Sequence, residues 1–238
     1  MKKLTNKTTI VPRILPRGRH KLDPDLVAAS QRQRLLEAMT ELVAEKGYAA
    51  VTIGDIVQRA GTAKRTFYDH FADKTQCFLA ALDVITEALL ATGRSTFAVS
   101  GGTRERTENS LRGYLARLVA MPSTAKVFYL EANAAGPEAV TRRNDVQLKF
   151  ARHIVTLSRK AAQQGEGQEL SEMHALGVVG AIHQLIYAQL HKHGPESLLE
   201  IAEDVVQVAA AFLTVRMPPR LRRPVRRGRA VRPARPAR

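Results

Sequence analysis

Apolar residues recur at helical spacing through the central part of the chain, and polar residues fill the positions between them. The first long helix is predicted by one such apolar set, which consists of Leu35, Leu36, Met39, Leu42 and Val43. This helix ends at Gly47 and begins either at Asp23 or at Ser30, because both residue types cap helices. No segment shows the sustained alternation of apolar and polar residues that marks a strand. The pattern predicts an all-α fold.

Two short helices come after the first, and their ends are well marked. Thr52, with an acidic residue three positions later, caps the first short helix, and Gly61 closes it. After a turn of three or four residues, Phe67 and Phe71 lie four positions apart and can pack on one face of the second short helix. A long helix with two short ones stacked on it predicts a helix-turn-helix motif over residues 52–71.

The rest of the body is also predicted to be helical. Beyond a loop around Ser100, further helices are expected over residues 106–121, 124–133, 137–164, 170–192 and 195–215. Gly-Pro-Glu at residues 136–138 and again at 194–196 marks two boundaries, since Gly ends a helix and Pro suits the first turn of the next. The chain therefore divides into an arm, a three-helix domain, a larger helical domain and a tail, at residues 1–22, 23–75, 76–215 and 216–238.

Charge is distributed unevenly along these parts. The net charge is +15, but seven of the 37 Lys and Arg residues lie in residues 1–22 and ten in residues 216–238, where there is no acidic residue. The body therefore carries 20 basic residues against all 22 acidic ones. Basic segments with few apolar residues are typical of flexible arms that attract a polyanion at long range. Specific recognition must then come from the body.

Composition and motifs exclude several other classes. The single Cys77 cannot form an intramolecular disulfide or a zinc framework, and the basic N-terminus lacks the apolar core of a signal peptide. No apolar run approaches the roughly 20 residues of a membrane span, so we expect a cytoplasmic protein without membrane contact. No phosphate-binding Gly-rich loop, nucleophile elbow or His-Glu-x-x-His motif is present. We therefore expect neither an enzyme nor a cofactor.

The second short helix carries side chains suited to DNA. It presents Lys64, Arg65, Thr66, Tyr68 and His70. Lys and Arg can donate hydrogen bonds to guanine in the major groove, and Thr, Tyr and Lys74 can donate to phosphate oxygens. These residue types on the second helix of a helix-turn-helix predict a DNA interface.

Residues 34–81 closely resemble the tetracycline-repressor (TetR) family of bacterial transcriptional regulators. The matching motifs are Gly47-Tyr48, Thr52-Ile53-Gly54-Asp55-Ile56, Ala60-Gly61, Thr66-Phe67-Tyr68-Asp69-His70-Phe71 and Asp73-Lys74. The resemblance implies that Thr52, Tyr68, His70 and Lys74 contact phosphates, and that Lys64, Arg65 and Thr66 face the groove. It also implies a homodimer formed by the helices near 170–192 and 195–215, with an effector cavity among the middle helices.

The turn between the short helices departs from the family pattern. After the glycine the family usually has an aliphatic residue and then Ser or Thr, whereas this chain has Thr62 and Ala63. Either Thr62 caps the following helix, or the turn is looser by about 1 kcal/mol. We include Thr62 among the candidate DNA-binding residues.

Candidate effector contacts lie in the larger helical domain. They are Tyr114, Phe128, Tyr129, His183 and Tyr187. The three aromatic residues at 114, 128 and 129 suit either a pocket or the core. His183, Tyr187 and His191 are spaced four apart on one helix and can line a cavity, whereas a metal site would need a third ligand from elsewhere. We predict no metal.

The sequence thus favours a DNA-binding transcriptional regulator. We expect a repressor that binds a palindromic operator as a homodimer and is released by a small-molecule effector. The alternative is a nucleoid-type protein that coats DNA with little sequence preference, as the basic tails allow. The helical body of about 160 residues after the motif favours the regulator, because a coating protein has little use for it.

Overall fold

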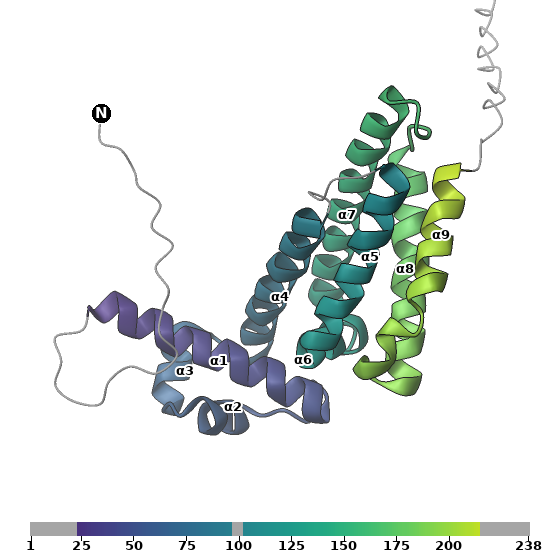
Figure 1. Ribbon diagram of the computed structural model, residues 1–238. Coiled ribbons are helices and arrows are strands. Elements are labelled where there is room, and N and C mark those ends of the chain that lie inside the picture. The colour runs from purple at the N-terminus through teal and green to yellow at the C-terminus, as the bar shows by residue number, and fades with distance from the viewer. Residues whose placement is uncertain (1–22, 97–101, 215–238) are drawn as a thin grey trace, which may run out of the picture.

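The computed structural model describes residues 23–96 and 102–214, and all regular structure in these ranges is helical (Figure 1). The N-terminal helices are α1 (Pro24–Lys46), α2 (Ile53–Ala60), α3 (Lys64–His70) and α4 (Lys74–Thr96). They are followed by α5 (Thr103–Ala120), α6 (Pro122–Lys126), the π-helix η1 (Val127–Glu131), α7 (Pro137–Gln163), α8 (Glu172–His193), the 3₁₀-helix η2 (Pro195–Leu199) and α9 (Ala202–Thr214). The predicted all-α fold is confirmed. The basic arm and tail lie outside the described residues.

The first helix begins at the earlier of its two candidate starts. The Asp23 side chain accepts a hydrogen bond of 3.0 Å from the Asp25 backbone, and Pro24 occupies the first turn. Gly47 ends α1 with a φ of +79°, a conformation that favours glycine. The helix runs across the foot of the larger helical domain, where it contacts α4, α6 and η1 (Figure 1).

Helix α4 connects the two parts of the molecule. It begins at Lys74 and continues into the larger domain, so the predicted boundary between residues 75 and 76 falls in its first turn. Its segment Lys74–Thr92 is long and apolar enough to cross a membrane by length and composition, but half of this segment is buried within the protein. Buried Phe78, Leu82 and Leu89 belong to the hydrophobic core. The apolar composition of α4 therefore reflects its place in that core.

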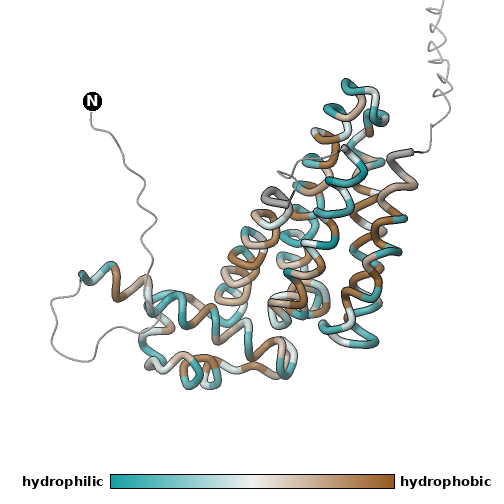
Figure 2. Tube along the Cα trace, in the orientation of Figure 1, coloured by the Kyte–Doolittle hydropathy of each residue, from teal (hydrophilic) through white to brown (hydrophobic). Residues whose placement is uncertain are grey.

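The larger domain packs α5, α7, α8 and α9 along one another above α1 (Figure 1). Figure 2 shows hydrophobic residues recurring along α4 and α9. Two predicted helices differ in detail. The one expected at 124–133 is α6 followed by the π-helix η1, and the one expected at 195–215 is divided into η2 and α9. In η2 the Ser197 hydroxyl donates to the Gly194 carbonyl at 2.7 Å, which stabilises a tight 3₁₀ turn there.

Candidate nucleic-acid interface and ligand cavity

Helix α3 presents unpaired cationic side chains to solvent. Lys64 and Arg65 are exposed, and within residues 23–96 and 102–214 neither has an ion-pair partner. Tyr68 is also exposed, with 57% of its surface accessible, whereas Thr66 and His70 are half-buried. Burial and the nearby Arg32 lower the pKa of His70. The structure thus brings five predicted DNA-binding residues together on one short helix.

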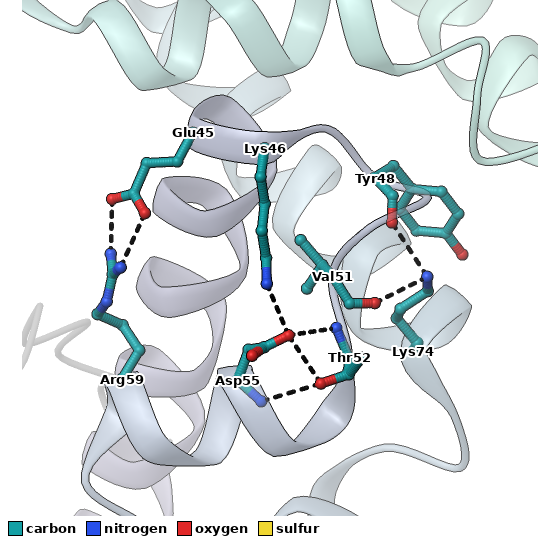
Figure 3. A network of polar contacts seen from close by, with 8 residues as sticks. All are labelled: Glu45, Lys46, Tyr48, Val51, Thr52, Asp55, Arg59 and Lys74. Carbon is teal, nitrogen blue, oxygen red and sulfur yellow. Dashed lines mark hydrogen bonds and ion pairs between the residues drawn. The ribbon is translucent and has the colours of Figure 1, made fainter.

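The cations beside α2 are neutralised within the protein (Figure 3). Arg59 donates two hydrogen bonds of 2.8 Å to the Glu45 carboxylate and one of 3.3 Å to Glu41. Lys46 donates to Asp55 at 2.8 Å. Hydrogen bonds from Lys46 and Thr52 hold the pKa of Asp55 well below its usual range. Since charges that are paired in the protein are less available to DNA, α3 is the better candidate for direct contact.

Thr52 forms the predicted cap of α2. Its hydroxyl donates to the Asp55 carboxylate at 2.7 Å and accepts from the Asp55 backbone N–H at 3.2 Å, and its own N–H donates to the same carboxylate (Figure 3). This reciprocal capping box fixes the start of α2. The hydroxyl proton is already used, so a phosphate contact by the Thr52 side chain stays a prediction.

Lys74 holds the connection between α1 and α2 against α4. Its ammonium donates hydrogen bonds of 3.0 Å to the carbonyls of Tyr48 and Val51, and it lies 4.3 Å from the centre of the Tyr48 ring (Figure 3). The Tyr48 hydroxyl in turn shares a hydrogen bond of 2.9 Å with Thr75. Lys74 therefore has a positioning role that the sequence did not indicate. Its predicted phosphate contact would use the third ammonium proton.

The turn before α3 lacks the predicted side-chain cap. Ala63 is the N-cap residue and forms no capping bond, and the hydroxyl of Thr62 is buried without a partner among the described residues. Of the two alternatives for this turn, a cap by Thr62 is therefore wrong, because its side chain turns inward. Arg34 stabilises this region instead: its guanidinium donates to the carbonyls of Ala60 and Gly61 at 3.0 and 3.4 Å. Helical periodicity alone gave no sign of that contact.

Aromatic packing fixes the orientation of α3. Phe67 is fully buried, and its ring lies 5.7 Å from that of Phe71 and 5.6 Å from that of Tyr68. The Arg32 guanidinium lies 5.5 Å from the centre of the Phe71 ring. The buried Phe67 anchors one side of α3, so its other side faces outward.

A cavity of about 280 Å³ lies among α5, η1, α7 and α8. Its wall is largely apolar, and Tyr114, Phe128, Tyr129 and His183 all line it, as predicted. Tyr187 does not line it: its ring is stacked parallel to that of His191, with centres 5.8 Å apart. The prediction for Tyr187 is wrong because a four-residue step along α8 moves the side chain below the cavity. Cavities of this kind bind small molecules.

One end of the cavity carries a cluster of neutral polar groups. The Tyr114 and Tyr129 hydroxyls are 3.1 Å apart, and the His183 ring centre lies 4.7 Å from that of Tyr129. Burial raises the pKa of Tyr114 to about 12 and also raises that of Tyr129. Burial, together with the nearby Arg143, lowers the pKa of His183 to about 4. All three groups are therefore uncharged near neutral pH.

The described residues offer neither a metal site nor a reactive cysteine. Within the described residues, no three His, Cys, Asp or Glu side chains come together in a way that could hold a metal ion. Cys77 is fully buried, and burial raises the pKa of its thiol to about 12. A thiol with that environment stays protonated and unreactive at neutral pH.

Comparison with known families identifies the N-terminal domain. Residues 35–81 match the profile described as "Bacterial regulatory proteins, tetR family". The three-helix domain is a TetR-family domain. This confirms the resemblance inferred from its motifs.

Individual relatives match this protein over part of the chain. The transcriptional activator FasR of Mycolicibacterium smegmatis is 27% identical over 99 residues, which is 42% of this chain and 45% of FasR. The uncharacterized regulator YvdT of Bacillus subtilis is 41% identical over 58 residues, 24% of this chain and 28% of YvdT. The chain thus spans less than half the length of these curated relatives.

Solved structures share the fold over most of the chain. The fatty acid degradation regulator FadR of Bacillus halodurans superposes with a TM-score of 0.67 at 19% identity, covering 79% of this chain and 96% of FadR. FadR of Bacillus subtilis, solved in complex with stearoyl-CoA, superposes with a TM-score of 0.66 at 16% identity, covering 76% and 98%. At these identities the likeness shows the fold alone.

One contact joins the cavity to the TetR-family domain. The carboxylate of Glu131 accepts a hydrogen bond of 2.9 Å from the backbone N–H of Tyr48, at the end of α1. Glu131 closes the π-helix η1, whose residues Phe128 and Tyr129 line the cavity. Glu131 was not predicted from the sequence, since a contact spanning 83 residues leaves no local pattern.

Proposed function

We propose that this protein is a cytoplasmic, dimeric transcriptional regulator that binds an operator through α3 and is controlled by a small molecule in the cavity. The observation that carries the proposal is the contrast between the two helices of the helix-turn-helix. Lys64 and Arg65 on α3 are exposed and unpaired among the described residues, whereas Arg59 on α2 is paired with acidic residues. In a helix-turn-helix, the second helix enters the major groove, where free Arg and Lys side chains contact guanine.

The cavity supports control by a ligand. Its wall is largely apolar with a small number of polar groups, as the walls of small-molecule sites usually are. The fold neighbour from Bacillus subtilis was solved with stearoyl-CoA, which supports an effector with a long apolar part. An effector alters DNA binding only if it binds one arrangement of the two DNA-binding domains more tightly than another.

The contact of Glu131 with Tyr48 gives the cavity a route to the DNA-binding domain. A ligand that repacks Phe128 or Tyr129 acts on the five-residue π-helix that ends in Glu131. The N–H group that Glu131 accepts from is that of Tyr48, in the connection between α1 and α2, and Lys74 also bonds to this connection. π-helices occur mostly as single turns within α-helices, with hydrogen bonds from i to i+5, and they often lie at functional sites. We infer that a change in η1 shifts α1 and thereby the spacing of the two α3 helices.

Dimerisation through α8 and α9 is supported by open space on α8. A Cβ atom built on Gly177 or Gly180 would meet no described atom within 4 Å, so another chain can approach closely here. Val205 and Ala209 of α9 are instead buried within the protomer. The predicted pairing surface therefore includes a face of α8 that its own chain leaves uncovered.

Selection of bound duplexes from a random pool, with purified full-length protein at about physiological salt, tests the proposal. We expect an inverted repeat whose half-sites are separated by about one helical turn or a multiple of it. Retention that grows with DNA length, without an enriched motif, would favour the nucleoid-type coating protein instead.

A promoter reporter then determines the direction of regulation. Repression is expected if the operator overlaps the promoter, and an inducing ligand should relieve it. Higher reporter output in the presence of the protein would show an activator, which is how the relative FasR is named.

A further inference from the structure

The cavity is elongated and polar at both ends. Its lining follows α5 from Thr103 to Tyr114, which at 1.5 Å per residue is about 16 Å of helix. Arg106 and Lys160 line the end near Thr103, and Glu166 lies 3.9 Å from Arg106 there. Between the two ends the lining is mainly apolar, with Leu111, Phe150 and Ile154, but it also includes Ser110 and His153. A volume of about 280 Å³ spread over such a length suits a narrow, extended molecule.

The other end of the cavity is formed by Tyr114, Tyr129 and His183, and it has hydrogen-bond donors without acceptors among the described residues. The two tyrosine hydroxyls bond to each other, so one of their two protons remains to be donated. The Nε2 atom of His183 is buried and has no hydrogen-bond partner in the described part of the chain. A neutral imidazole can present its proton on Nε2. Buried polar atoms without partners are rare and costly in folded proteins.

The electrostatics at this end favour an oxygen acceptor. No acidic side chain is among the described residues that line the cavity. Arg143 lies close enough to His183 to lower its pKa, and the bond it donates goes to the neutral side chain of Asn133. Two available N–H and O–H donors in a positive field are best satisfied by a carbonyl or carboxylate oxygen.

We propose that the ligand of this cavity is an extended apolar molecule that carries a carbonyl or carboxylate oxygen at the end that reaches Tyr114, Tyr129 and His183. This inference rests on the proposed effector role of the cavity and names the class of effector. A plain alkyl end, such as the methyl end of a stearoyl chain, offers no acceptor and would leave the donors unpaired. Sites built to bond a polar group discriminate strongly against analogues that lack it.

Two isomeric ketones test the position of the oxygen. 2-Decanone and 5-decanone have the same formula, but only the first carries its oxygen near an end. Titration calorimetry on the full-length protein should show 2-decanone binding about tenfold more tightly, since the second isomer leaves the donors unpaired. Decanoate is the third probe and distinguishes a carboxylate from a ketone.

Variants that remove one donor provide the second arm. Tyr114→Phe and His183→Phe should each reduce the preference for 2-decanone over 5-decanone to about twofold or less. Tyr187→Phe is the matched control, because that hydroxyl lies on the same helix as His183 but outside the cavity. It should leave the preference unchanged.

Equal affinity for the two ketones, a preference that survives both cavity variants, or no binding of any of the three probes would overturn the inference. None of these results bears on the operator experiment, which is performed without ligand. Failure of the proposed function would appear there, as the absence of an inverted repeat.

Discussion

The region around α2 and the polar end of the cavity differ in whether their polar side chains have partners within the protein. Around α2, the side chains of Lys46, Asp55 and Lys74 all have partners within the protein. At the cavity, the Nε2 atom of His183 has none among the described residues. Satisfied groups hold a fixed geometry, whereas an unsatisfied buried group lowers stability until something binds it. The difference separates the region that positions α3 from the cavity for which we propose a ligand.

The same contrast holds on a smaller scale within the helix-turn-helix. Arg59 is paired with two carboxylates, while Arg65, six residues later, is exposed and unpaired in the described structure. Both residues are arginines in adjacent helices, so residue type alone does not separate them. The two arginines differ in their partners. Arg59 is paired with carboxylates of α1 and so joins α2 to α1, whereas Arg65 is unpaired among the described residues and remains available to DNA.

Phe67→Ala is expected to have the largest effect on stability. The side chain is fully buried under α3, and such truncations cost about 3–5 kcal/mol. Urea unfolding should show this loss. Tyr68→Ala is the control at the neighbouring exposed position and should change the free energy of unfolding by less than about 1 kcal/mol. Similar losses for both variants would mean that α3 is not anchored by Phe67.

Arg65→Ala should weaken operator binding by about 1–3 kcal/mol and relax the preference at one base pair. Arg59→Ala should leave that preference intact, because its guanidinium is bonded to Glu45. Binding titrations with the selected operator and with single-base variants measure both effects. Loss of base preference in the Arg59 variant, but not in the Arg65 variant, would reverse the roles assigned to the two helices.

Lys74→Met should lower both stability and DNA affinity. The change removes the hydrogen bonds that the ammonium donates to the Tyr48 and Val51 carbonyls, which costs about 1–3 kcal/mol. Operator and random DNA should be weakened alike, because the whole helix-turn-helix shifts. Lys64→Met is the control and should leave the unfolding midpoint unchanged. An unaltered midpoint for the Lys74 variant would show that its contacts contribute nothing.

Much of the fold could be predicted because its signals are local. Helix ends are encoded within a few residues, as the capping box of Thr52 and the Gly-Pro pairs show. The division of the expected 195–215 helix was missed because it depends on the Ser197 hydroxyl bonding to Gly194, and serine side chains have several alternatives.

The site was predicted where a motif carries it and missed where distant segments meet. The residues of α3 were predicted from one short motif. Arg34 and Glu131 act through bonds to residues 26 and 83 positions away, and no periodicity reports such pairs. For the same reason Tyr187 was assigned to the cavity: spacing along α8 shows which residues share a face, but not where the cavity ends along that face.

Glu131→Ala should uncouple the cavity from the DNA-binding domain. Loss of the acceptor for the Tyr48 N–H should speed hydrogen exchange at that amide and lower operator affinity by about 1 kcal/mol. Glu131→Gln is the matched control, because its amide oxygen can still accept the bond. Exchange at Tyr48 that is equally slow in all three proteins would exclude Glu131 from the coupling.

The pH dependence of stability should report the environment of His183 at the polar end of the cavity. The pKa of His183 is lowered to about 4 in the folded protein, against about 6.5 for a free histidine. As the pH falls below about 6.5, His183 is therefore protonated in the unfolded chain but stays neutral in the folded protein. The stability contributed by neutral His183 is lost progressively down to about pH 4. Paired carboxylates with lowered pKa, such as Glu166, contribute below about pH 4.5. His183→Phe should reduce the slope of the unfolding free energy between pH 6.5 and 4.5, where His70, whose pKa is also lowered, still contributes. Ile182→Val, at a neighbouring position on the cavity wall, should shift the curve without changing its slope. An unchanged slope in the His183 variant would mean that water or another group already satisfies this imidazole, which would remove the contrast with the paired side chains around α2.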